Sequence, residues 1–391
     1  MLGCRIVWRV KSKRSFSSCI SYVTDVEGNL DYFHKAIRFS SEVDLKNGQL
    51  HFYDDKGLFC YGGDVCDHGV GDIRISSMLL NFKMRYPDRV FLVAGNRDLN
   101  KMRFLEELDM NNTPVEKVQY ILRETMGAPE AFKYRKMELN EIEGDVSDFQ
   151  VAQSFKNSVE PGGFMFEYLQ QAQLAVTIEN SLFIHGAIPA NGVGFVPGLQ
   201  SRITCPNEWV YEINRFYNSQ LNDSYATGVI EYGRPGGCSG KGIVYNDWLT
   251  KNDTMPEPIP ENVNSFLVSG GIHRVVTGHR PHGDSPTIIK GEKMLVVTAD
   301  TSYSDKNADD NRGVAMSEVL VDIQADTTRV RGILRDGTPI DYIAEHDPHV
   351  GLPMDNGWIK TPLGDNRYIV CFSKGHGTYS SNLRYETRII Q

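Results

Sequence analysis

The feature that most constrains the fold is a series of short, β-rich apolar runs, most of which end in glycine followed by a polar residue. The runs read LFCYGGD, RVFLVAGN, SLFIHGA, RVVTGH, KMLVVTAD, SEVLVDI and RVRGIL. Each run has the length and composition of a strand. Helical patterns fall between them, at residues 29–39, 71–86, 99–126 and 163–173. This alternation predicts an α/β fold in which functional groups lie where strands pass into loops.

The composition is that of an ordinary globular protein. A chain of 391 residues can bury one large core or two smaller ones. Its longest apolar runs have only the length of a strand, which predicts no membrane insertion. The net charge of -9 argues against broad nucleic-acid binding and leaves open a local basic groove. Seven scattered cysteines without a CxxC pair predict free thiols in a reducing, intracellular compartment.

Residues 1–18 differ in composition from the rest of the chain. They contain five basic residues and several serines, and the first acidic residue of the chain is Asp25. This basic, amphipathic pattern is typical of a mitochondrial transit peptide, and a plastid transit peptide has the same features. The alternative is a disordered basic segment on a cytoplasmic protein. The mitochondrial interpretation is favoured.

Polar side chains that can bind a metal ion or take part in catalysis lie at five predicted strand ends. In the first, SYVTDVEGN, Asp25 and Glu27 follow a strand. The other four are GDVCDHG at 63–69, GNRD at 95–98, HG at 185–186 and GHRPHG at 278–283. Carboxylate, amide and imidazole groups on several loops of one face suit a pair of divalent ions such as Mn, Fe, Zn or Mg. Such ions would also neutralise neighbouring acids.

Each cluster taken alone has a simpler interpretation. Asp25 and Glu27 before Gly28 and Asn29 are typical of a helix N-terminus. GDVCDHG and GNRD can be turns, and a His-Gly pair can be a polar strand end. The histidines of GHRPHG can be solvated. The joint occurrence of all five, in this order and each at a strand end, favours a metal site.

Together the five stretches resemble the motifs of the calcineurin-like metallophosphoesterases, which read Asp-x-His, GDxxDxG, GN-His-Asp/Glu, a later His and Gly-His-x-His. The matching stretches here are DVE, GDVCDHG, GNRD, HG and GHRPH. The resemblance implies a four-layer α/β/β/α sandwich with a two-metal site at the strand C-termini. It assigns residues 20–335 to this domain, with a polar insertion at about 127–162, and leaves residues 336–391 as a small C-terminal extension.

The resemblance implies two divalent ions with assigned ligands. Asp25 matches the aspartate of the first ion, and Asp64 matches the carboxylate that bridges both ions. The residues that match ligands of the second ion are Asn96, His185 and His279.

Three positions depart from the family pattern. Glu27 stands in place of a first-ion histidine, and its carboxylate favours Mn, with Fe, Zn or Mg as alternatives. Arg97 stands in place of the GNH histidine, which assists leaving-group departure; arginine cannot donate a proton near neutrality but binds phosphate oxygens well. The last motif has two residues between its histidines instead of one, so the remaining first-ion ligand is His282 or, alternatively, Asp284.

The resemblance also implies a catalytic set. Asp67 supports the site or orients an acid in relatives. His68 is the candidate for binding phosphate or protonating the leaving group, with a solvated loop histidine as the alternative. The predicted catalytic residues are Asp67, His68, Arg97 and Asp98.

The stretch EYGRPGGCSGKGIVYNDWL, residues 231–249, is predicted to be a loop near the mouth of the site. Its Gly-Lys pair is one residue short of a nucleotide-binding phosphate loop and lacks the Ser/Thr, so that interpretation is rejected. Arg234, Lys241 or Tyr245 would contact substrate there, with Arg97 as a further phosphate ligand. A plain connecting loop is the alternative.

The implied function is hydrolysis of a phosphorylated substrate, most simply a phosphomonoester. In the family scheme, a hydroxide that bridges two ions attacks phosphorus in line. Because the GNH histidine is lost, the alternative is a catalytically weak relative that serves as a binding or scaffold module. Phosphoprotein, nucleotide and small-molecule substrates are equally compatible with the sequence.

Overall fold

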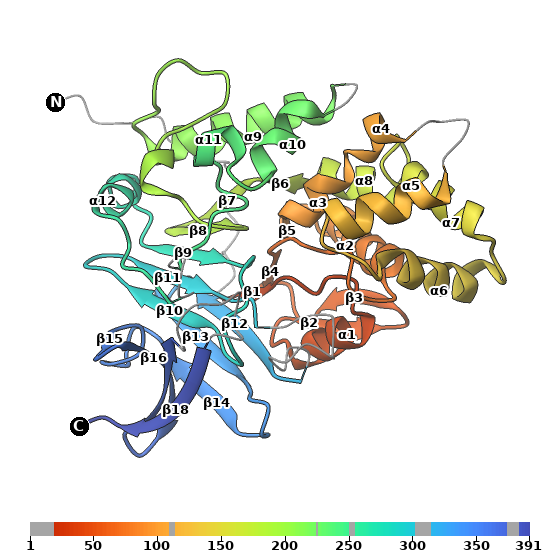
Figure 1. The fold of residues 1–391 in the computed structure, drawn as a ribbon. Coiled ribbons are helices and arrows are strands. Elements are labelled where there is room, and N and C mark those ends of the chain that lie inside the picture. The colour runs from red at the N-terminus through yellow and green to blue at the C-terminus, as the bar shows by residue number, and fades with distance from the viewer. Residues whose placement is uncertain (1–18, 109–113, 224–225, 250–254, 302–313, 374–382) are drawn as a thin grey trace.

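The computed structural model describes residues 19–108, 114–223, 226–249, 255–301, 314–373 and 383–391 (Figure 1). The predicted transit peptide, residues 1–18, lies outside them. Within the described ranges, no helix is long and apolar enough to cross a membrane. Six cysteines fall in these ranges, and all six are free thiols.

The larger sheet has seven strands in the order β14-β13-β12-β1-β4-β5-β6. Strands β1, β4, β5 and β6 are mutually parallel, and β12 to β14 continue the sheet in antiparallel pairing. The predicted C-terminal extension therefore begins within this sheet, because β14 pairs with β13. The strands span β1 Cys19–Val23, β4 Leu58–Tyr61, β5 Val90–Val93, β6 Ala172–Gln173, β12 Met316–Asp322, β13 Thr327–Ile333 and β14 Pro339–Ile343.

The second sheet has five strands in the order β10-β11-β9-β8-β7. Its central strands β11, β9 and β8 are parallel to one another. The strands span β7 Ala175–Ile178, β8 Ser181–Ile184, β9 Arg274–Thr277, β10 Thr287–Lys290 and β11 Leu295–Thr298.

The two sheets pack face to face through alternate residues of their strands. On β1, Ile20 and Tyr22 belong to the core between the sheets, whereas Val23 belongs to the core on the helical side. The ring of Tyr22 stacks on that of Phe183 on β8, with centroids 5.8 Å apart. Each fully buried side chain of this size contributes about 1.5–3 kcal/mol. Because successive side chains of a strand point to opposite faces of the sheet, one strand contributes to both cores.

Helices cover the outer face of the larger sheet, and α9 packs against β7 of the second. The predicted α/β class is confirmed, and the four-layer order stays a prediction. The helix predicted over residues 99–126 is instead divided into shorter helices, and Pro114, which lacks a backbone N–H, precedes one of them. The main helices are α1 Leu30–Phe39, α2 Asp72–Arg85, α3 Asn96–Lys101, α4 Phe104–Glu107, α5 Val115–Tyr120, α8 Phe164–Gln171, α9 Pro206–Leu221, α10 Thr227–Gly233, α11 Gly237–Gly240 and α12 Glu261–Ser269.

The stretch predicted to be a polar insertion forms two helices, α6 (Ala131–Glu143) and α7 (Asp148–Ser158). Their buried residues, which include Leu139, Val151 and Phe155, join the core on the helical side. The polar composition of this stretch reflects its outer faces. Short elements complete the fold: β2 Val43–Lys46, β3 Gln49–Phe52, the π-helical turn Ile121–Thr125 and the 3-10 turn Ala190–Gly192.

A third, four-stranded sheet at the C-terminus packs beside the second sheet (Figure 1). Its strands are β15 Pro353–Met354, β16 Gly357–Gly364, β17 Arg367–Ser373 and β18 Leu383–Ile389. Lys360 of β16 is buried and donates to the carbonyl oxygens of His282 and Ser285 and to Thr287 Oγ1. This one amine connects the sheet to the loop that follows β9.

Replacing Lys360 tests this connection. We expect Lys360→Ala to lower the free energy of unfolding by about 2–4 kcal/mol, because it leaves buried acceptors unpaired and opens a cavity. Urea unfolding measures the change. The control, Lys136→Ala, removes an exposed lysine and should change the value by less than about 0.5 kcal/mol. Equal effects of the two substitutions would contradict this interpretation.

Candidate active site

Five strand ends meet at one place in the structure. Strands β1, β4 and β5 are parallel neighbours, as are β8 and β9, so the residues that follow each group lie at one edge of its sheet. Contacts between the groups, described below, show that the two edges adjoin. All five sequence motifs therefore contribute to a single site.

The loops at these strand ends adopt a backbone conformation that is rare outside glycine. Five site residues have positive φ: Asp25 (50°), Glu27 (47°), Asp64 (55°), Asp67 (109°) and His279 (73°). Such residues cost about 1–3 kcal/mol each and cluster at functional sites. Glycine is required at two neighbouring positions, because a Cβ on Gly95 or Gly278 would overlap the carboxylate of Asp64 or Asp25, respectively.

One group of three side chains has the geometry to hold a metal ion. Within the described part of the chain, ligand atoms of Asp64, His185 and His279 lie within 4.8 Å of one another. Asn96 extends this group, because its Oδ1 is 3.0 Å from His185 Nε2. The structure thus brings together the bridging carboxylate and all three residues predicted for the second ion.

Backbone carbonyls orient both imidazoles of this group. His185 Nδ1 donates to the carbonyl oxygen of Gly62 at 2.8 Å, and His279 Nε2 donates to that of Tyr245 at 2.8 Å. When neutral, His185 therefore directs its Nε2 lone pair towards Asn96 Oδ1 and, at 3.4 Å, Asp64 Oδ2. Three acceptors that face one another are stabilised by a proton on His185 or by a metal ion between them. The donor set of carboxylate, amide and imidazole fits a divalent ion such as Mn, Fe or Zn.

The surroundings shift the pKa values of His185 and His279 in opposite directions. Burial alone would lower the pKa of His185, but the carboxylates of Asp64 and Asp25 outweigh it and raise the pKa to about 10. Burial, together with the positive charges of His185 and Arg280, holds the pKa of His279 well below its usual value. Without a metal ion, His185 thus carries the proton that offsets the nearby acids.

Asp98 holds the loop that presents Asp64. Its carboxylate accepts from the backbone N–H groups of Asp64 (3.0 Å), Val65 (2.8 Å) and Gly95 (2.9 Å). Burial and the charge of Asp64 raise the pKa of Asp98 to about 6. These contacts describe a positioning residue, and its predicted catalytic role stays a prediction.

Helix α3 supplies two cations to the neighbouring acids. Arg97 Nε lies 2.7 Å from Glu27 Oε1, and Arg97 Nη1 lies 3.5 Å from Asp67 Oδ2. Lys101 Nζ donates to the same Asp67 oxygen at 2.6 Å. Sequence reasoning did not identify Lys101. The signal was its spacing of four residues from Arg97, which places both on one helical face.

The remaining predicted ligands of the first ion are engaged in other contacts. Asp25 accepts from the backbone N–H of His279 at 3.1 Å and from Thr24 Oγ1, and burial, with Asp64 nearby, raises its pKa to about 8. His282 Nδ1 lies 3.0 Å from both Thr287 Oγ1 and Lys360 Nζ. Their roles as ligands stay predictions.

Two further side chains from the predicted set have defined surroundings. The backbone N–H of His68 donates to the carbonyl oxygen of Glu27 at 2.7 Å, which places His68 beside the acids. Burial lowers the pKa of His68, so its imidazole is neutral at pH 7 and suits hydrogen bonding better than proton donation. Asp284, the alternative to His282, accepts from the backbone N–H of Arg335 at 3.2 Å.

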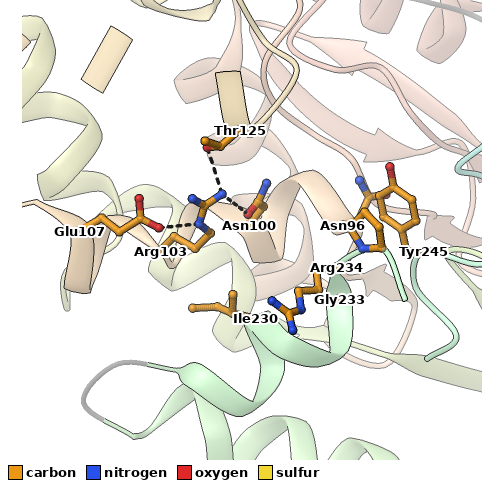
Figure 2. Close-up of a pocket in the computed structure, with 10 residues that line it drawn as sticks. Asn96, Asn100, Arg103, Glu107, Thr125, Ile230, Gly233, Arg234 and Tyr245 are labelled. Atoms are coloured by element: carbon orange, nitrogen blue, oxygen red, sulfur yellow. Dashed lines mark hydrogen bonds and ion pairs between the residues drawn. The ribbon is translucent and has the colours of Figure 1, made fainter. Parts of the chain in front are cut away.

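A pocket of about 460 Å³ opens beside Asn96. Figure 2 shows Asn96 and Tyr245 at one end, Arg234 below them, and Arg103 bound to Asn100, Thr125 and Glu107 at the other end. Arg234 and Tyr245 thus line this pocket, and their contact with substrate stays a prediction. Lys241, which lies over the ring of Phe195 at 5.0 Å, is not among the pocket-lining residues.

Comparison with solved structures supports the fold. A cold-active protein-tyrosine phosphatase from a psychrophilic Shewanella species superposes with a TM-score of 0.52 at 14% identity, covering 83% of this chain and 80% of that one. A Saccharomyces cerevisiae protein serine/threonine phosphatase gives a TM-score of 0.43 at 14% identity, with coverages of 86% and 83%. A metallophosphoesterase from Sphaerobacter thermophilus gives 0.39 at 8% identity, with coverages of 81% and 88%. No family model and no curated protein matches the chain significantly.

The chain shares the α/β fold of the Shewanella phosphatase, which agrees with the fold class that its sequence predicts. At this identity, the likeness to the Shewanella enzyme shows the fold and no more. The chemistry must therefore be argued from the residues of this chain.

The raised pKa of His185 predicts that metal binding releases protons. Below about pH 10 the imidazolium must lose its proton before Nε2 can bind an ion, so affinity should rise with pH, by up to about tenfold per unit for each proton released. Calorimetry of Mn²⁺ binding in buffers of different ionisation enthalpy counts these protons. His346→Gln, in an exposed turn, should leave the count unchanged. Binding with no proton release would contradict the expectation.

Proposed function

We propose that the chain is a divalent-metal-dependent phosphoesterase that hydrolyses phosphomonoesters. The observation that carries this proposal is the donor set of Asp64, Asn96, His185 and His279, with both imidazoles oriented by backbone carbonyls. An ion bound there would act as a Lewis acid on a phosphoryl oxygen and lower the pKa of a water molecule. Manganese is the proposed metal, with iron or zinc equally suited to these ligands.

The side chains around this donor set have separate tasks in the proposed reaction. Asp98 holds the Asp64 loop in place, and Tyr245 fixes the tautomer of His279. The guanidinium of Arg97 supplies a fixed positive charge that offsets negative charge on the phosphoryl oxygens. Neutral His68 would accept or donate a hydrogen bond beside the acids.

The pocket beside Asn96 supports a substrate that extends beyond its phosphoryl group. Arg103 and Arg234 give this pocket two cationic side chains against one acid, Glu107. Arg103 is held by three partners, whereas the side chain of Arg234 is 61% exposed and has one ion-pair partner, Glu231. A leaving group with its own anionic or polar atoms fits this lining.

Replacing Asp64 tests the proposed function. We expect Asp64→Asn to remove bound Mn²⁺ and to lower the hydrolysis of an aryl phosphate at least about a hundredfold, because the variant loses an anionic ligand. Metal analysis and a chromogenic assay measure the two effects. Asp365→Asn, in an exposed turn, is the matched control and should change neither. A metal-loaded wild type without hydrolysis across a panel of phosphoesters would favour the binding or scaffold module instead.

Replacing Arg234 tests the substrate pocket. We expect Arg234→Ala to raise KM about five- to thirtyfold for a substrate with a second anionic group, because one charge-assisted hydrogen bond is lost. The KM for a plain aryl phosphate should stay the same. Lys241→Ala is the control, because Lys241 does not line the pocket. An equal rise in both variants would place the substrate elsewhere.

A further inference from the structure

The sequence differs at three positions from the metallophosphoesterase motifs that it resembles. Two of the residues at these positions contact each other, and the third contacts a lysine. Glu27 and Arg97, which each replace a histidine, form one ion pair with Nε and Oε1 2.7 Å apart. His282, from the motif with altered spacing, has Nδ1 3.0 Å from Lys360 Nζ. Two of the three departures thus meet in one place, beside Asp64 and Asp67.

Arg97 is also tied to the other acids of that place. Its Nε lies 3.7 Å from Asp64 Oδ2, and its Nη1 lies 3.5 Å from Asp67 Oδ2. Its own backbone N–H donates to Asp64 Oδ1 at 2.8 Å. One guanidinium thus contacts three carboxylates that come from the loops after β1 and β4.

This cluster is closed to solvent. The side chains of Glu27, Asp64 and Asp67 are 7%, 3% and 0% exposed, and that of Arg97 is 19% exposed. Lys101, 2% exposed, pairs with the same oxygen of Asp67. In such surroundings an ion pair is weakly screened, and a second cation placed among the same oxygens would be strongly repelled.

The charges balance with a single divalent ion. Four acids, Asp25, Glu27, Asp64 and Asp67, lie in this cluster, and Arg97 and Lys101 contact the last three of them. With all four carboxylates ionised, the two cations leave two negative charges, which one divalent ion neutralises. A second ion would leave an excess of positive charge in a buried site, which is costly.

We propose that Arg97 permanently occupies the place of the first metal ion, so that the chain binds one divalent ion, at Asp64, Asn96, His185 and His279. The guanidinium supplies the charge that a first ion supplies elsewhere, through donors rather than ligand bonds. Glu27 and Asp67 are then partners of Arg97 and Lys101, not metal ligands. Asp25 keeps its contact with the His279 backbone.

This inference rests on the metal site of the proposed function, and its test does not depend on hydrolysis. Full-length protein is stripped with a chelator, loaded with excess Mn²⁺, desalted and analysed for metal per chain. We expect one ion in the wild type and two in Arg97→Met, which frees the carboxylates. Arg215→Met removes an exposed arginine and should leave the count at one.

Glu27→Gln keeps the test decisive even if Arg97→Met does not fold. Because Glu27 is proposed to bind Arg97 and not the ion, the Gln variant should still hold one ion, with an affinity lowered by the lost negative charge but not abolished. Two ions or none in the wild type, a loss of metal in Glu27→Gln, or a single ion in folded Arg97→Met would overturn the inference. One ion without hydrolysis would overturn the proposed function alone, whereas two ions with hydrolysis would overturn this inference alone.

Discussion

Four carboxylates, those of Asp25, Glu27, Asp64 and Asp67, are buried together at the ends of β1 and β4, and each is at most 5% exposed. Two like charges about 4 Å apart repel by about 4 kcal/mol at an effective dielectric constant of about 20. Arg97 and Lys101 supply positive charge to three of these acids, and the backbone N–H of His279 donates to Asp25. The pattern of cations around them therefore decides what the site can bind.

Helix α3 supplies two cations to these acids, and its other faces carry different groups. Arg97 and Lys101, four residues apart, meet the acids. Asn96 and Asn100 face the pocket (Figure 2), and Asp98 accepts hydrogen bonds from backbone N–H groups of the Asp64 loop. A helix of six residues thus connects the candidate metal donors, the acid cluster and the pocket beside Asn96. The two imidazoles from the second sheet complete the donor set, so the packing of the sheets fixes the geometry of the site.

Much of this could be predicted from sequence, because strand runs and their terminal residues are local patterns. The runs that end in Gly63, Gly95 and Gly278 specify strands, and the residues after them converge once parallel strands share an edge. The grouping of Asp64, His185 and His279 was implied by the resemblance to the metallophosphoesterase motifs. Helices α6 and α7 were not predicted, because their apolar residues are sparse and emerge as a face only when packed.

Contacts between distant side chains could not be predicted in this way. Glu27 and Arg97 each stand where the metallophosphoesterase motifs that the sequence resembles have a histidine, but only the structure shows that the two residues touch. The contact of His282 with Lys360 spans 78 residues and depends on how the C-terminal sheet docks. Lys101 carries no motif, and its importance comes from the buried carboxylate opposite it.

The anomalous diffraction of a crystal of the Mn²⁺-loaded protein tests most directly whether Arg97 occupies the place of a first metal ion. We expect one manganese peak, in contact with Asp64, Asn96, His185 and His279, with the guanidinium of Arg97 against Glu27. A second peak bound by Asp25 and Glu27, with Arg97 displaced from the acids, would contradict it.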